Sequence, residues 1–248
     1  FLFFTTLFYG QKNTSNKIDS VAYYIKLADF YKQKNNYKLS IFNANHALRY
    51  AEKTNNKHNK SLAFTSLGTT FFELKKTNDA IDAFSKSIKE LNNLPLSSNL
   101  ALNYYKLGMC HMSLEEYARA EAYINKSQAI YSTLKIENQE LINLQKGIIY
   151  KTKGKKKLAT ELFDNIISKP DSEDTFKTKA EALYQLATIE IKSNRYNLAL
   201  NYLNRALQKN TTDVNPEQRI RILFALSTVN DKLLNLKKSY DYLKEHVT

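Results

Sequence analysis

The side chains that most often catalyse reactions or bind metals are few in this sequence and lie far apart. The four histidines share no metal-ligand spacing: His46, His58, His111 and His246. Cys110 is the one cysteine, which excludes an intramolecular disulfide and a zinc site made of several cysteines. We expect Cys110 to be a small buried residue beside Met109, with a reactive thiol as the alternative.

Catalytic sequence motifs are also missing. The chain has no HExxH, no GxSxG, no glycine-rich phosphate loop, and no cysteine spaced from a histidine as in a thiol enzyme. The adjacent carboxylates Glu115 and Glu116 lie in a turn-prone stretch, where exposure to solvent explains them. The sequence therefore predicts a protein that is not an enzyme, with no cofactor and no metal.

The formal net charge of +13 is split between two separate stretches of the chain. Residues 1–60 carry +7 and residues 141–170 carry +5, whereas residues 61–140 carry −1 and residues 171–248 carry +2. Most of the basic residues are lysine, while recognition of bases and phosphates favours arginine. The pattern therefore disfavours nucleic-acid binding, which stays open as an alternative function.

The densest basic run is a lysine cluster within the second stretch: Lys151, Lys153, Lys155, Lys156 and Lys157. The simpler interpretation is a solvated hairpin tip. The alternative is a contact with an acidic partner or with anionic lipid headgroups.

The elements that would position these side chains are helices. Five glycines and three prolines in 248 residues are too few for an all-β protein with many turns. Apolar residues recur every three or four positions, as an amphipathic helix requires; one example is the series Leu102, Tyr105, Met109 and Met112. We therefore expect an all-α chain.

A small residue recurs at nearly constant spacing along the chain. It occupies positions 28, 68, 108, 147, 187 and 227 as Ala28, Gly68, Gly108, Gly147, Ala187 and Ser227. A second small residue follows twelve positions later in each unit, and a mostly large apolar residue follows four positions after that. Turn-prone residues lie between the two small positions. Each unit is therefore predicted to be two antiparallel helices whose backbones approach at the small residues.

This pattern resembles the tetratricopeptide repeat family. The unit that fits best contains Phe64, Leu67, Gly68, Phe71, Ala80, Phe84 and Ser87. The period exceeds the usual family length of about 34 residues, and the longer form is similar to the arrays of bacterial two-component and helix-turn-helix signalling regulators. The resemblance implies a right-handed superhelical solenoid of six helical hairpins over residues 21–248.

The same resemblance implies a partner-binding groove lined by the first helix of each hairpin. Carried over residue by residue, the groove positions are Thr65, Thr69, Phe72, Tyr105, Met109, Met112, Leu144, Ile148, Lys151, Tyr184 and Thr188. A helical stripe of this kind can also be core packing. If the groove interpretation holds, Tyr105, Met109, Met112 and Ile148 should be partly exposed, with Leu107 and Ile124 buried.

The two ends of the chain suggest export and a continuation. Residues 1–9, FLFFTTLFY, are too short to span a bilayer and are similar to the apolar part of a signal peptide, so residues 1–20 are expected to be a leader. Export to the periplasmic face is favoured, and a cytoplasmic location is the alternative. The last hairpin has no polar cap, which indicates truncation at the C-terminus and leaves open a dimer formed through segments beyond Thr248.

Together these features predict a non-catalytic sensor region of a bacterial signal-transduction protein, which binds a protein or a peptide. One alternative is a stand-alone adaptor that assembles other proteins. The other is a basic nucleic-acid-binding helical repeat protein.

Overall fold

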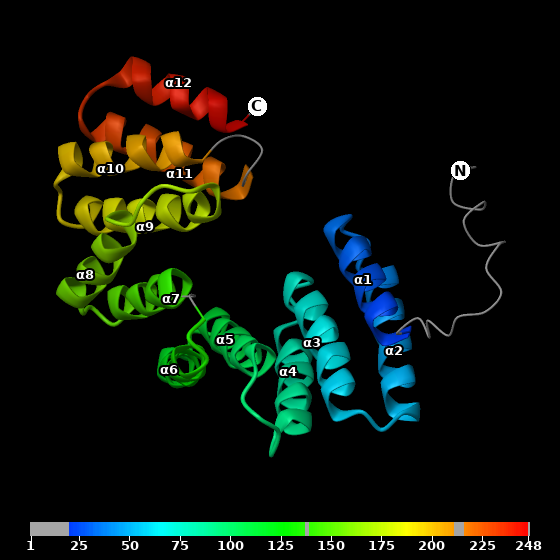
Figure 1. Cartoon of the computed structure of the whole chain (residues 1–248). Coiled ribbons are helices and arrows are strands. Elements are labelled where there is room, and N and C mark those ends of the chain that lie inside the picture. The colour runs from blue at the N-terminus through cyan, green and yellow to red at the C-terminus, as the bar shows by residue number, and fades with distance from the viewer. Residues whose placement is uncertain (1–19, 137–138, 211–215, 248) are drawn as a thin grey trace. The chain divides into compact units, whose positions relative to one another are not determined.

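The computed structural model describes residues 20–136, 139–210 and 216–247 of the chain (Figure 1). Within these ranges the chain forms twelve α-helices and no strand. The predicted all-α array of six helical hairpins is confirmed. The leader predicted at residues 1–20 lies outside the described residues, apart from Ser20, which begins the first helix.

The helices divide between two compact units, residues 1–95 and residues 96–248, each described here by itself. The first unit contains α1 (Ser20–Gln33), α2 (Tyr37–Lys53), α3 (Lys57–Glu73) and α4 (Thr77–Leu91). The second contains α5 (Ser98–Ser113), α6 (Tyr117–Thr133), α7 (Gln139–Thr152), α8 (Lys156–Ile167), α9 (Glu173–Ile191), α10 (Tyr196–Lys209), α11 (Pro216–Lys232) and α12 (Leu236–Val247).

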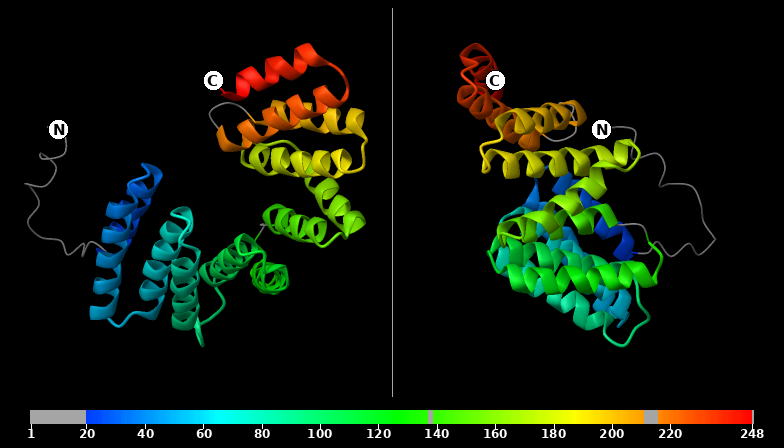
Figure 2. Two further views of the ribbon diagram at one scale, coloured as in Figure 1. Left: turned by 180° about the vertical axis from the view of Figure 1, so that it is seen from behind. Right: turned by 90° about the vertical axis from the view of Figure 1, so that its left-hand side faces the viewer.

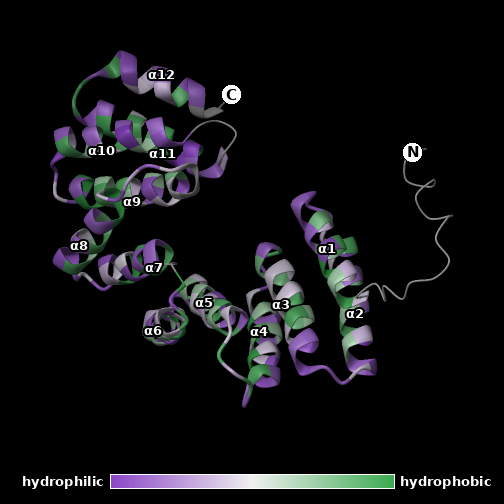
Figure 3. Cartoon of the chain, in the orientation of Figure 1, coloured by the Kyte–Doolittle hydropathy of each residue, from purple (hydrophilic) through white to green (hydrophobic). Residues whose placement is uncertain are grey.

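Each odd-numbered helix pairs with the next even-numbered helix to make one hairpin. In the second unit, α9 and α10 lie side by side in each view, and so do α11 and α12 (Figure 2). Both hydrophilic and hydrophobic residues occur along these helices (Figure 3). None of the described helices is long and apolar enough to cross a membrane.

The hairpin turns repeat with the period of the small residues. Each turn has one residue with a left-handed backbone, at Asn35, Lys75, Glu115, Gly154, Asn194 and Leu234. At every turn the next backbone N–H donates to a carbonyl five residues earlier, which closes the C-terminus of the first helix. Only one of the six turn residues is glycine, so the other side chains bear the steric cost of this conformation.

The small residues of the repeat lie where the two helices of a hairpin cross. A Cβ atom added to Gly68 would lie 2.7 Å from the ring of Phe84, and one added to Gly108 would lie 2.6 Å from Cγ1 of Ile124. Gly147 and Phe163 repeat this arrangement at 2.5 Å. The predicted burial of Gly68 and Gly108 at helix crossings is therefore confirmed, because the large residue of each partner helix fills the space that a side chain would occupy.

Candidate functional site

In the first unit, the predicted groove residues lie on α3. Thr69 and Phe72 are half-buried. Thr65 is buried, and its hydroxyl contacts the Ser87 hydroxyl at 3.0 Å and donates to the Ser61 carbonyl at 2.9 Å. Thr65 is therefore a packing residue of the α3–α4 hairpin and offers no surface to a ligand, which corrects its assignment to the groove.

In the second unit, an apolar surface follows α5 and α7. Tyr105, Met109, Met112 and Ile148 are half-buried, whereas Leu107 and Ile124 are buried. The expected distribution of exposure is thus observed. We call the surface formed by the incompletely buried side chains of α5, α7, α9 and α11 the odd-helix face.

Leu144 is the second groove residue that the structure moves into the interior. It packs with Phe163, Ala182 and Leu186 in one buried cluster. The position four residues later, Ile148, packs against the same cluster but keeps part of its surface exposed. Since the neighbouring hairpin covers Leu144, it stabilises the array and does not line the odd-helix face.

A cavity of about 470 Å³ adjoins the apolar end of this face. It is lined by residues of α5, α6 and α7: Leu102, Tyr105, Lys106, Tyr131, Leu141 and Ile142. Burial raises the pKa of Tyr105 to about 12, although a hydrogen bond from Gln145 opposes this rise. Tyr105 therefore stays protonated and connects α5 to α7 through the Gln145 amide.

Lys151 connects α7 to α9 further along the face. Its ammonium donates to the side-chain oxygens of Gln185 and of Thr188, the latter at 3.0 Å. Burial is the main cause that lowers the pKa of Lys151, and the charges of Lys192 and Arg221 lower it further, while Glu181 opposes them. Lys151 was predicted as a groove residue and also as part of a lysine cluster at a hairpin tip. The structure separates it from that cluster, because it lies in the last turn of α7 with its side chain half-buried.

The other lysines of the cluster lie at the α7–α8 turn and in the first turn of α8. Lys153 pairs with Glu121 at 2.5 Å, and Lys155 lies over the ring of Tyr150. These lysines are exposed at the hairpin tip, as the simpler interpretation expected, and two of them also contact a neighbouring side chain.

Glu181 connects α9 to α11. It accepts hydrogen bonds from Arg221 at 2.8 Å, from Gln218 at 3.0 Å and from Gln185 at 2.7 Å. Burial alone would raise the pKa of the Glu181 carboxyl, but the Arg221 charge and these hydrogen bonds outweigh it and lower the pKa. The Arg221 guanidinium also lies 5.1 Å from the ring centre of Tyr184. Side-chain contacts therefore join α5 to α7, α7 to α9 and α9 to α11.

Five polar residues of these contacts were not predicted from the sequence: Gln145, Glu181, Gln185, Gln218 and Arg221. Gln185 occupies the same repeat position as Gln145. The recurrence of glutamine at the same register position in two successive repeats was the signal that could have identified these two residues. The pairing of Glu181 with Arg221 has no comparable signal, because the two residues are 40 positions apart.

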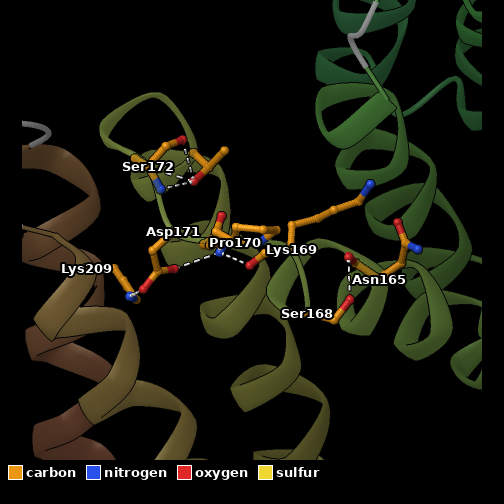
Figure 4. Close-up of polar contacts among 9 residues, drawn as sticks. Asn165, Ser168, Lys169, Pro170, Asp171, Ser172 and Lys209 are labelled. Carbon is orange, nitrogen blue, oxygen red and sulfur yellow. Dashed lines mark hydrogen bonds and ion pairs between the residues drawn. The ribbon is translucent and has the colours of Figure 1, made fainter.

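A second polar cluster anchors the link between α8 and α9 (Figure 4). Lys179 is only 3% exposed, and its ammonium donates to the carbonyls of Lys169 and Pro170 and to Asp171 at 2.7 Å. Lys209 of α10 also pairs with Asp171. Hydrogen bonds from Lys179 and Lys209 lower the pKa of Asp171 to about 2. All three donors of the Lys179 ammonium are thus satisfied. The cluster joins the α8–α9 link to α9 and to α10.

Cys110 and His111 are engaged in packing. Cys110 is buried, which raises the pKa of its thiol to about 12. His111 is buried against the ring of Tyr123 at 5.2 Å, and its Nδ1 lies 2.6 Å from a carboxylate oxygen of Glu116. In the part of the chain that the structure describes, no three histidine, cysteine or acidic residues are grouped as metal ligands.

Comparison with known proteins identifies the repeats. A model of the tetratricopeptide repeat matches residues 21–54, 101–133 and 180–208. No curated protein sequence is detectably similar to the chain.

Solved structures share the fold. The quorum sensor NprR from B. thuringiensis, in its apo form, superposes with a TM-score of 0.77 at 16% identity, over 92% of this chain and 64% of NprR. NprR in complex with its cognate peptide NprX gives 0.70 at 16% identity, over 96% and 68%. PilW, a type IV pilus biogenesis factor, gives 0.66 at 19% identity, over 91% of each chain. At these identities the likeness concerns the fold alone, and this chain spans less than two thirds of the apo NprR structure.

Proposed function

We propose that this chain, a tetratricopeptide-repeat protein, binds an extended peptide or a peptide segment of a partner protein on the odd-helix face of its second unit. The observation that carries the proposal is the composition of this face. Apolar side chains that are neither fully buried nor fully exposed occupy α5 and α7. Polar side chains that also keep exposed surface occupy α9 and α11, namely Tyr184, Thr188 and Arg221. Apolar contacts and polar contacts are thus available to one ligand.

The apolar half of the face suits binding rather than packing alone. Met109 and Met112 are flexible and polarisable, so they adapt to ligand side chains of different shape. Tyr105 and Tyr184 offer rigid aromatic surface at little cost in conformational entropy. The fold is shared with NprR, whose structure with its cognate peptide supports a peptide as the class of ligand.

We place this binding in the sensor region of a bacterial signal-transduction protein, without a catalytic step. The stand-alone adaptor is the second candidate, and the fold shared with PilW, a type IV pilus biogenesis factor, supports it. Sequencing the gene beyond Thr248 separates the two candidates: an output domain supports the sensor, and a stop codon supports the adaptor.

Export of the protein is part of the proposal and rests on the sequence of residues 1–9. Fractionation of cells that express the full-length protein tests it. Recovery of the repeats outside the cytoplasm supports the proposal, and recovery only inside contradicts it.

The binding proposal is tested by placing a charge on the face. Met109→Glu and Ile148→Glu should each reduce retention of heptapeptides from a random synthetic pool by about tenfold or more, since a carboxylate disrupts the apolar contact. Both variants should melt close to the parent, because a half-buried side chain can keep its charge hydrated. Leu198→Glu is the control, since it places the same charge on an exposed apolar residue of α10.

If Met109→Glu and Ile148→Glu fold and retain peptides as well as the parent does, the odd-helix face is not the binding surface. If both variants unfold while Leu198→Glu does not, the two residues are core positions.

A further inference from the structure

Lys151 has a feature that its role in joining two helices does not explain. Its ammonium has three N–H groups, and the contacts of the described residues use two of them, on Gln185 and Thr188. Both acceptors are neutral. The third N–H is left for a ligand at the boundary between the apolar and polar parts of the odd-helix face.

The charge of Lys151 is also uncompensated. Among the described residues no carboxylate lies within ion-pair distance of its ammonium, whereas Lys153 pairs with Glu121 and Lys179 pairs with Asp171. A partly buried charge without a counter-charge is unfavourable, so an anion at this point would stabilise the array.

The surrounding charges favour an anion as well. Lys192 and Arg221 are near enough to lower the pKa of Lys151, and Glu181 is the one acidic group that opposes them. The Glu181 carboxylate is already held by Arg221, Gln218 and Gln185. The local sum, three cations and one anion, is therefore positive.

The class of anion follows from the donors. Arg221 is already bonded to Glu181, so the donor offered to the ligand is the Lys151 ammonium between two neutral hydrogen-bonding neighbours. This arrangement matches a single carboxylate, whereas phosphate sites usually gather several free cations or backbone amides. Ile148 lies one helical turn before Lys151 and is half-buried, so apolar surface adjoins the charge.

We infer that the peptide bound on the odd-helix face presents a carboxylate to the ammonium of Lys151, with an apolar residue beside it. This inference rests on the proposed function. The carboxylate comes either from an aspartate or glutamate side chain or from the C-terminus of the peptide. The chemistry at Lys151 is the same in both cases.

The test changes the ligand first, so that it does not depend on the folding of a variant. The best-retained heptapeptide from the random synthetic pool is resynthesised in two altered forms. In one the C-terminus is amidated, and in the other each aspartate or glutamate is replaced by asparagine or glutamine. We expect one of the altered forms to bind the parent chain about tenfold more weakly, as expected for loss of a charge-assisted contact. The altered peptide that binds more weakly identifies the source of the carboxylate.

Variants then locate the contact. On Lys151→Gln, the unaltered and altered peptides should bind with equal affinity, while Lys151→Arg should restore the difference. Lys157→Gln, which removes the same charge from an exposed position of α8, should preserve it.

Two outcomes overturn the inference in different ways. If peptides are retained and both altered forms bind within about twofold of the original, the inferred contact between a peptide carboxylate and Lys151 is refuted. The proposed peptide-binding function is unaffected by that result. If the pool yields no retained peptide, the proposed function and the inference fail together.

Discussion

Gly108 should tolerate no side chain, although alanine at a helix interior is ordinarily better than glycine by about 1 kcal/mol. The structure reverses this expectation, because an added Cβ would lie 2.6 Å from Cγ1 of Ile124 and 3.2 Å from the backbone oxygen of Ala120. Carbon atoms in favourable contact lie about 3.5–4.0 Å apart, so the overlap is about 1 Å. The Ala120 backbone blocks a sideways escape. We expect Gly108→Ala to lower the free energy of unfolding by about 1–3 kcal/mol, the usual cost of overpacking.

The first hairpin indicates which second substitution should compensate for Gly108→Ala. There Ala28 faces Ala44 at the register positions that Gly108 and Ile124 occupy in the third hairpin, and both alanines are buried. Ile124→Ala alone should cost about 2–5 kcal/mol through the cavity that it leaves. The double variant Gly108→Ala with Ile124→Ala should cost clearly less than the sum of the single changes, because the new methyl group occupies part of the cavity.

Urea unfolding followed by circular dichroism measures these differences. Ala122→Gly, at an exposed position of α6, is the control for helix propensity and should lose about 0.5–1 kcal/mol. The packing argument is refuted if Gly108→Ala is as stable as the parent, or if the double variant loses the full sum of the two single effects.

Three further outcomes follow from the structure. Asp171→Asn should lower the melting temperature at neutral pH. This difference from the parent should shrink as the pH falls from 3.8 to about 2, because a lowered pKa stabilises the fold only while the carboxylate stays ionised. A difference independent of pH would contradict the ion pair with Lys179. Cys110 should resist a thiol-specific disulfide reagent at mildly alkaline pH until urea is added, since burial raises the pKa of its thiol to about 12. Rapid reaction of the folded chain would show that the thiol is accessible. Leu234→Gly should raise the free energy of unfolding by up to about 1 kcal/mol. Leu234 has φ 61° and an 82% exposed side chain, so glycine relieves the backbone strain without loss of packing. A less stable variant would mean that the leucine side chain makes a stabilising contact.

The sequence by itself determined the hairpins, their number and their register. The reason is that a helical hairpin is a local structure. Its two helices are read from apolar spacing, and their closest approach is read from two small residues twelve positions apart, as with Gly68 and Ala80. The left-handed turn residues fall in the turn-prone pieces for the same reason, and Pro216 begins α11 as its fixed φ predicts.

Only the tertiary structure decided which residues of the first helices stay accessible and which polar groups meet. Thr65 and Tyr105 occupy equivalent positions, yet one is buried in packing and the other is half-buried beside a cavity. The pairs Lys151–Gln185, Glu181–Arg221 and Lys179–Asp171 join different helices or a helix and a link. Long side chains reach such partners only when neighbouring hairpins pack at a particular angle and offset, and the repeat period specifies neither.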